Sequence, residues 1–114
     1  MILDFSQYRF FIRPGKTDLR KGINGLSVLI QNVMENDPFS KTLFLFCNGK
    51  HKLLKIVYWD RNGFCLWQKK LERSKFPWPQ SSEAGREIRF EELKMLLDGI
   101  DFFKAHEELS YSRV

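Results

Sequence analysis

The sequence predicts a single α+β domain: an antiparallel β-sheet meander packed against one main N-terminal helix, with a short C-terminal helix. The chain has 114 residues, a length that suits one hydrophobic core. Its first third contains apolar residues at helical spacing, and three apolar runs separated by turn residues follow. Hydrophobic residues make up 43% and charged residues 29%, as expected for a globular protein.

The first two elements are a strand and the main helix. An aromatic run over residues 8–13 reads as a strand that stops at Pro14-Gly15. Thr17 is expected to cap a helix over residues 18–34, with Asp18 in the first turn, where a negative charge suits the helix dipole. The buried stripe of this helix is expected to comprise Leu19, Ile23, Leu26, Ile30 and Val33.

Two glycines fall inside this predicted helix. Gly22 and Gly25 each cost about 1 kcal/mol relative to alanine, so a close approach of the helix to the sheet or to a partner would explain them. The helix should end at residues 36–38, because the residue before Pro38 is disfavoured in the α region.

The meander is expected over the middle of the chain. Residues 42–47 form an unbroken apolar run typical of a central strand, and Asn48-Gly49 supplies a turn. Residues 53–59 form the next strand, residues 60–63 turn the chain again, and residues 64–71 run back.

The last third predicts a short strand and a helix. Prolines exclude residues 76–79 from a central strand, so an edge or a covering loop is expected there. Residues 86–90 read as a strand and residues 91–97 as an amphipathic helix that ends at Gly99.

The expected domain spans residues 1–103, and residues 104–114 form a tail without a clear pattern. Cys47 and Cys65 fit neither a disulfide scaffold nor a CxxC pair and read as reduced thiols. The start resembles no signal peptide, and no stretch has the ~20 apolar residues of a membrane span. We therefore expect a cytoplasmic protein that makes no membrane contact.

Charge is distributed unevenly along the chain. The net charge is +5, yet residues 41–79 hold nine Lys and Arg against two Asp and Glu, whereas residues 80–114 hold five against eight. A basic centre favours a polyanionic partner, and the acidic last third leaves room for a protein partner. A solvated surface without a binding role would also give this pattern.

No catalytic constellation emerges from the motifs. His51 and His106 lack a second ligand at metal-binding spacing, and there is no GxSxG motif or P-loop. The aspartates that a metal-dependent transferase would need are explained better as helix-start and turn residues. We therefore predict no enzyme activity, no catalytic residue, no metal and no cofactor.

The pattern that most favours a binding site is an interleaving of lysine and tryptophan on the second hairpin. If the turn is a three-residue loop with a bulge, Val57 lies opposite Trp67 and Lys55 opposite Lys69, and one face carries Lys55, Trp59, Trp67 and Lys69 together. Ammonium groups attract phosphates and indoles stack on bases, which favours nucleic acid. Against this, sheet tryptophans usually lie in a core, and a one-residue shift would scatter the cluster. Further lysines and arginines extend the positive potential at the strand ends: Lys50, Lys52, Lys70, Arg73 and Lys75.

A second basic pair, Arg20 and Lys21, lies near the predicted helix start, where an anion can bind. The alternative is that both residues belong to the solvent-facing side of the helix. The predicted nucleic-acid-binding residues are thus Lys55, Trp59, Trp67, Lys69, Lys70, Arg20 and Lys21.

The sequence resembles a known family in several blocks that occur in order. Residues 17–26, Thr-Asp-Leu-Arg-Lys-Gly-Ile-Asn-Gly-Leu, are similar to the opening motif of the accessory protein, often called TnpB, of insertion-sequence 66 transposons. It departs from the family pattern at Asn24, where aspartate is common, and at Ser74, where glycine is common. Further matching blocks, within a resemblance that covers residues 8–103, are 37–40, 43–46, 55–60, 63–67, 69–72, 76–79 and 96–101.

The resemblance implies a role in transposition beside a larger transposase of the same element, which carries the catalytic carboxylates. It implies no chemical step and no RNA-guided nuclease, although such nucleases share the TnpB name. The leading hypothesis is an accessory protein that binds DNA. The alternatives are an adaptor that docks on the transposase through an aromatic face or the acidic third, and an intrinsic metal-dependent nuclease. The oligomeric state stays open.

Overall fold

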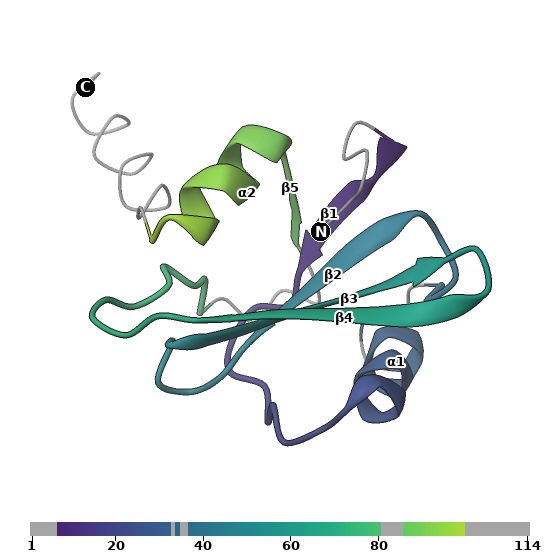
Figure 1. Ribbon diagram of the computed structural model, residues 1–114, viewed down its shortest axis with the longest axis horizontal. Helices are drawn as coiled ribbons and strands as arrows, with labels where there is room; N and C mark the ends of the chain where they lie inside the picture. The colour runs from purple at the N-terminus through teal and green to yellow at the C-terminus, as the bar shows by residue number, and fades with distance from the viewer. Residues whose placement is uncertain (1–6, 33, 35–36, 81–85, 100–114) are drawn as a thin grey trace.

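The computed structural model describes residues 7–32, 34, 37–80 and 86–99. A five-stranded sheet in the order β4-β3-β2-β1-β5 carries one helix on each face (Figure 1). The predicted α+β class is confirmed. The elements are β1 (Arg9–Ile12), α1 (Ile23–Asn32), β2 (Thr42–Cys47), β3 (Leu53–Asp60), β4 (Gly63–Lys70), β5 (Arg86–Ile88) and α2 (Phe90–Leu97).

The sheet is mixed, so the prediction of a purely antiparallel sheet is wrong. Strands β2, β3 and β4 form the expected antiparallel meander. Strand β1, however, pairs with β2 in parallel, because the chain crosses over through α1 before it enters β2. The short β5 pairs antiparallel with the other edge of β1 and completes the sheet.

Strand β2 lies at the centre and is buried on both faces, as its unbroken apolar run predicts. On the α1 face, Phe44 and Phe46 pack with Leu26 and Ile30 of the helix. On the α2 face, the alternate residues of β2 meet the last helix and the covering loop. This second core includes Leu43, Leu45, Leu54, Ile56, Phe76, Trp78, Leu93 and Leu96.

Helix α1 begins at Ile23 and ends at Asn32, so its predicted start at residue 18 is wrong. Thr17 does not cap the helix: it is buried, and its hydroxyl accepts a 2.9 Å hydrogen bond from the Arg13 guanidinium. Asp18 is likewise absent from the first turn. Its carboxylate accepts hydrogen bonds from Arg20 instead. A short polar side chain that bonds to a nearby backbone N–H stabilises a local turn, and this turn competes with helix formation.

The two glycines do not mark a close approach to the sheet. Gly22 precedes the helix, and a methyl group added there would meet no atom within 4 Å. A methyl group added at Gly25 would lie 3.1 Å from the side chain of Lys21, which is a local contact.

The C-terminal helix follows the prediction closely. The Glu92 carboxylate accepts a 3.0 Å hydrogen bond from the Arg89 backbone N–H and so closes the first turn. Gly99 ends the helix with φ +76° and donates its N–H to the Leu96 carbonyl. The predicted tail at residues 104–114 lies outside the described residues.

Residues 76–79 form the covering loop rather than an edge strand. Trp78 is buried and donates its indole N–H to the Arg13 carbonyl at 2.9 Å. The Gly15 N–H donates to the Pro79 carbonyl at 2.8 Å, so the loop is bonded to the segment that follows β1.

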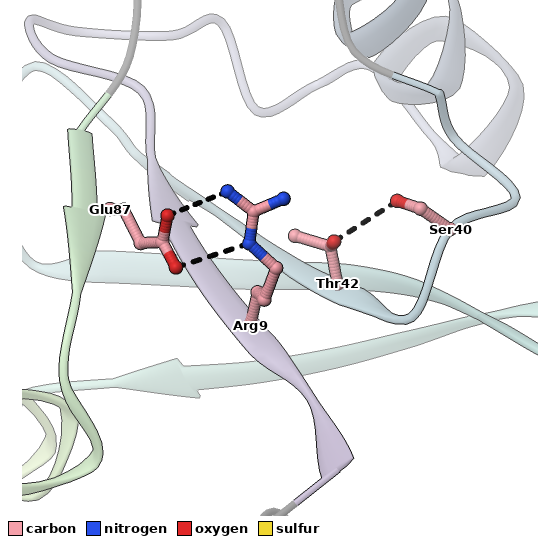
Figure 2. A network of polar contacts seen from close by, with 4 residues as sticks. All are labelled: Arg9, Ser40, Thr42 and Glu87. Atoms are coloured by element: carbon pink, nitrogen blue, oxygen red, sulfur yellow. Dashed lines mark hydrogen bonds and ion pairs between the residues drawn. The ribbon is translucent and has the colours of Figure 1, made fainter.

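The β5 edge of the sheet is joined to β1 by polar contacts (Figure 2). The Arg9 guanidinium donates two hydrogen bonds, of 2.7 and 3.1 Å, to the Glu87 carboxylate. The ion pair lowers the pKa of Glu87 and raises that of Arg9. Close by, a 3.0 Å hydrogen bond joins the hydroxyls of Ser40 and Thr42 where the chain enters β2.

Candidate nucleic-acid interface

The β3–β4 hairpin has a register that differs by one residue from the predicted one. Asp60 pairs with Gly63 across a two-residue turn, so Lys55 lies opposite Gln68 and Ile56 opposite Trp67. The expected three-residue loop with a bulge is therefore wrong. Because side chains alternate along a strand, this shift moves Trp67 and Lys69 to the face opposite Lys55 and Trp59.

Trp67 and Lys69 both lie on the face of the sheet that α2 covers, and each makes a contact there. Trp67 is half-buried and packs against the core under α2. The Lys69 ammonium donates a 2.8 Å hydrogen bond to the Leu97 carbonyl at the end of α2. A cation at this position satisfies a free carbonyl and interacts favourably with the helix dipole. Both residues thus have structural contacts.

Lys55 lies on the other face, under the chain that leads into α1. Its ammonium donates to the Leu19 carbonyl at 2.7 Å and also lies 3.5 Å from the Lys21 carbonyl. These contacts attach the loop to the sheet and engage the Lys55 ammonium with backbone carbonyls of the protein itself.

Trp59, on the same face, belongs to an aromatic cluster with Phe39 and Phe64. The Trp59 ring meets Phe39 edge-on at 4.9 Å and Phe64 edge-on at 5.1 Å between centroids. Phe39 is 57% exposed, which leaves much of the cluster open to solvent.

Arg20 and Lys21 precede α1 and are exposed. The Arg20 guanidinium hydrogen-bonds the Asp18 carboxylate at 2.9 and 3.0 Å, and this lowers the pKa of Asp18 to about 2. The predicted placement of both cations on the helix is therefore wrong, although they remain at the surface close to its start.

The structure instead gathers cations at one end of the sheet, where the turn between β2 and β3 meets the loop after β4 (Figure 1). The Leu71 N–H donates to the Lys52 carbonyl at 2.8 Å, and the Phe76 N–H donates to the His51 carbonyl at 2.7 Å. The loop after β1 joins them, because the Thr17 N–H donates to the Cys47 carbonyl. We call this surface the basic end; its cations are Lys16, Arg20, Lys50, Lys52, Lys70, Arg73 and Lys75.

An open pocket of about 560 Å³ lies beside the basic end. Its wall includes the cations Lys16 and Arg20, together with Asn48, Gly49 and Leu53. A carbon of the Lys16 side chain would lie 3.5 Å from a methyl group at Gly49, so this lysine lies along the turn. Sequence reasoning missed Lys16, because nothing in the local pattern brings residue 16 to residue 49.

The central cations lack compensating carboxylates. Among the described residues, ion pairs join Arg9, Arg20, Arg86 and Arg89 to acidic groups, and none involves a lysine or arginine of residues 41–79. Glu72 lies in the sequence between Lys70 and Arg73 without an ion pair to either. Apart from Arg20, which pairs with Asp18, the cations of the basic end therefore carry a positive charge that no ion pair with a described residue offsets.

Two features of other functional classes are absent from the same described ranges. No group of three or more His, Cys, Asp or Glu side chains is placed to hold a metal ion. No helix in that part of the chain is both long enough and apolar enough to span a bilayer.

These observations define a small basic α+β protein with a cationic sheet end and an exposed aromatic cluster. Residues 8–107 match the sequence profile of the IS66 Orf2-like proteins. The chain belongs to this family, which is associated with transposition of insertion sequences.

Two relatives come from Sinorhizobium fredii (strain NBRC 101917 / NGR234). The uncharacterized protein y4hO is 36% identical over 94 residues, which cover 82% of each chain. The uncharacterized protein y4jC is 31% identical over 94 residues, which cover 82% of this chain and 80% of the relative. No solved structure matches the chain significantly.

Proposed function

We propose that this protein is a non-catalytic accessory protein of insertion-sequence transposition that binds DNA through the basic end and assists a separate transposase. The observation that carries the proposal is the cluster of seven cations from three loops and the end of β4, of which only Arg20 forms an ion pair within the described residues. Loops that hold lysine and arginine without carboxylate partners attract the phosphates of nucleic acid.

Of the residues predicted from the sequence, the proposal retains Lys70 and Arg20 as direct contacts, with Lys21 beside them. Lys55 and Lys69 hold the loop and α2 in place through backbone carbonyls. Trp67 packs on the core, and Trp59 belongs to the aromatic cluster. In this proposal these four residues support the surface without touching DNA.

The test is the salt dependence of binding to labelled duplex DNA, measured by fluorescence anisotropy. If about five of the cations reach phosphates, the slope of log K against log salt should be roughly −4 to −5. Absence of binding at low salt would overturn the proposal.

A matched pair of charge reversals locates the surface. Lys50→Glu with Lys52→Glu alters the basic end, whereas Lys41→Glu with Arg61→Glu makes the same charge change at the opposite end of the sheet. The first pair should weaken DNA binding at least tenfold, and the second should have a much smaller effect. Equal losses would show that net charge, and not the basic end, governs binding.

The exposed aromatic cluster favours a second candidate function, a protein adaptor that docks on the transposase. Val28 is also 53% exposed, on the helix that covers this face. Buried aromatic anchors are typical of protein interfaces. In this case Phe39→Ser should abolish co-purification with the co-expressed transposase and leave DNA affinity unchanged, whereas the Lys50→Glu, Lys52→Glu variant should do the reverse.

A further inference from the structure

The outer edge of β4, which is eight residues long, has no neighbouring strand among the described residues. β4 is the last strand on its side of the sheet, and its pairing with β3 runs without a bulge from Gly63 to Lys70. It contains no proline. Long regular edges of this kind offer a row of backbone donors and acceptors to another strand.

The register shows which groups point outward. Asp60 and Gly63 flank the two-residue turn as a hydrogen-bonded pair, and the Leu71 N–H donates to the Lys52 carbonyl in the same phase. Odd-numbered residues of β4 therefore bond to β3, and even-numbered residues direct their N–H and C=O groups away from the sheet. No backbone hydrogen bond to a described residue occupies these outward groups of Phe64, Leu66, Gln68 and Lys70.

The side chains of this strand are incompletely covered on both faces. Phe64 and Leu66 are half-buried beside the α1 core, and Cys65 and Trp67 are half-buried beside the α2 core. A further strand would continue both faces and cover all four side chains. Its positive charge is confined to one end, at Lys69 and Lys70.

We propose that a second copy of this chain pairs with β4 antiparallel, so that two sheets join across a twofold axis. Outward residues can bond only to outward residues, and centring the pair on Trp67 uses all four of them. Trp67 then lies directly opposite Trp67 of the partner subunit, and Gln68 lies opposite the partner's Leu66.

The distribution of charge along β4 favours a second copy of the chain as the partner and antiparallel as the direction of pairing. Parallel pairing would place Lys69 and Lys70 beside the same residues of the other copy, where like charges repel. Antiparallel pairing places Lys70 opposite the partner's Phe64 and Lys69 opposite the partner's Cys65, so that the cations of the two copies lie at opposite ends of the pair. The strand is thus complementary to itself, which is the requirement of a twofold interface.

The mass in solution, measured by light scattering after size exclusion without nucleic acid, tests the proposal. The expected mass is twice 13.6 kDa. Gln68→Pro removes an outward N–H, which an edge strand tolerates, and should give a monomer, whereas Gln68→Ala should remain dimeric. A monomeric wild type, or a dimer in both variants, would overturn the proposal.

A spin label tests the register of the β4 pairing between the two copies without introducing a proline into the strand. The pairing places the two Gln68 Cα atoms diagonally about 7–8 Å apart. A nitroxide on Gln68→Cys in a Cys65→Ser background should show strong dipolar broadening, and one on Lys41→Cys in that background should show none. Absence of broadening at residue 68 contradicts the pairing even if Gln68→Pro fails to fold. Because neither experiment contains DNA, the result is independent of the proposed function.

Discussion

The ammonium of Lys55 donates a 2.7 Å hydrogen bond to the backbone carbonyl of Leu19, which lies 36 residues earlier in the chain. This contact attaches the loop before α1 to the middle of β3. The contact therefore positions Arg20 at the pocket wall, although Lys55 itself makes no ion pair with a described residue.

Replacement of Lys55 by methionine keeps the apolar stem and removes the donor. The Leu19 carbonyl then loses its charged partner, so Lys55→Met should lower the free energy of unfolding by about 1.5–3 kcal/mol. Lys50→Met, at an exposed position, should change it by about 0.5 kcal/mol or less. Urea denaturation followed by tryptophan fluorescence measures both values. Equal stability of the two variants would show that the bond contributes nothing.

The neighbours Lys69 and Lys70 should have opposite roles. Lys69→Met removes the cation at the end of α2 and should cost about 1 kcal/mol of stability with little change in DNA affinity. Lys70→Met should leave stability almost unchanged and weaken DNA binding by about 1 kcal/mol or less, which corresponds to at most fivefold. Thermal unfolding and fluorescence anisotropy separate the two effects, and a reversed outcome would contradict the proposed interface.

The two thiols should differ in reactivity. Burial raises the pKa of Cys47 to about 12, so its reactive thiolate is nearly absent at neutral pH. Cys65 is half-buried. In the Gln68→Pro variant, whose β4 edge is free, a thiol reagent should therefore modify Cys65 before unfolding, and Cys47 only after unfolding. Mass spectrometry with Cys65→Ser as the control would show unmodified folded protein; rapid labelling of that variant would contradict the burial of Cys47.

The Cys47 pKa also has a consequence at high pH. Because the folded value is raised, the contribution of the protonated thiol to stability is complete below the ordinary value of 9.0 and is lost as the pH rises toward 12. Cys47→Ala should remove this part of the alkaline decline in stability, measured by urea denaturation between these limits.

The Asp18 carboxyl should titrate near pH 2 in the folded protein, because hydrogen bonds from Arg20 stabilise its charged form. Since its folded pKa is lowered, the contribution is present above the ordinary value of 3.8 and is lost as the pH falls through about 2. Carbon-13 NMR of the carboxyl measures this midpoint. In Arg20→Ala the midpoint should return toward 3.8, and an unchanged value would show that Arg20 is not the cause.

Local patterns in the sequence predicted most elements, because apolar alternation and turn residues act over a few positions. The central strand Thr42–Cys47 and the end of α2 at Gly99 were predicted correctly for this reason. The start of α1 was missed because Asp18 forms a side-chain turn with Arg20 that competes with helix. The parallel pairing of β1 with β2 depends on contacts between distant segments, which periodicity does not reveal.

The candidate site depended on a single turn. Arg61 adopts φ +54°, a left-handed conformation that glycine favours, and so allows a two-residue turn without glycine at that position. The predicted cluster rested on a three-residue loop with a bulge, which would place every side chain of β4 on the face opposite to the one it occupies. The prediction of positive potential at the strand ends was less affected, because the turns and loops at the ends of the strands lie close together in either register.

The place of β1 between β2 and β5 has a consequence for biosynthesis. Strand β1 leaves the ribosome before the other strands of the sheet, yet its neighbours on either side are residues 42–45 and 86–88. A nascent chain that has emerged as far as residue 80 can form the meander and pair β1 with β2. The other edge of β1 has no partner strand until β5 emerges. Such an intermediate would expose Phe10 and Ile12, so premature termination upstream of residue 86 should yield a product prone to self-association and rapid proteolysis.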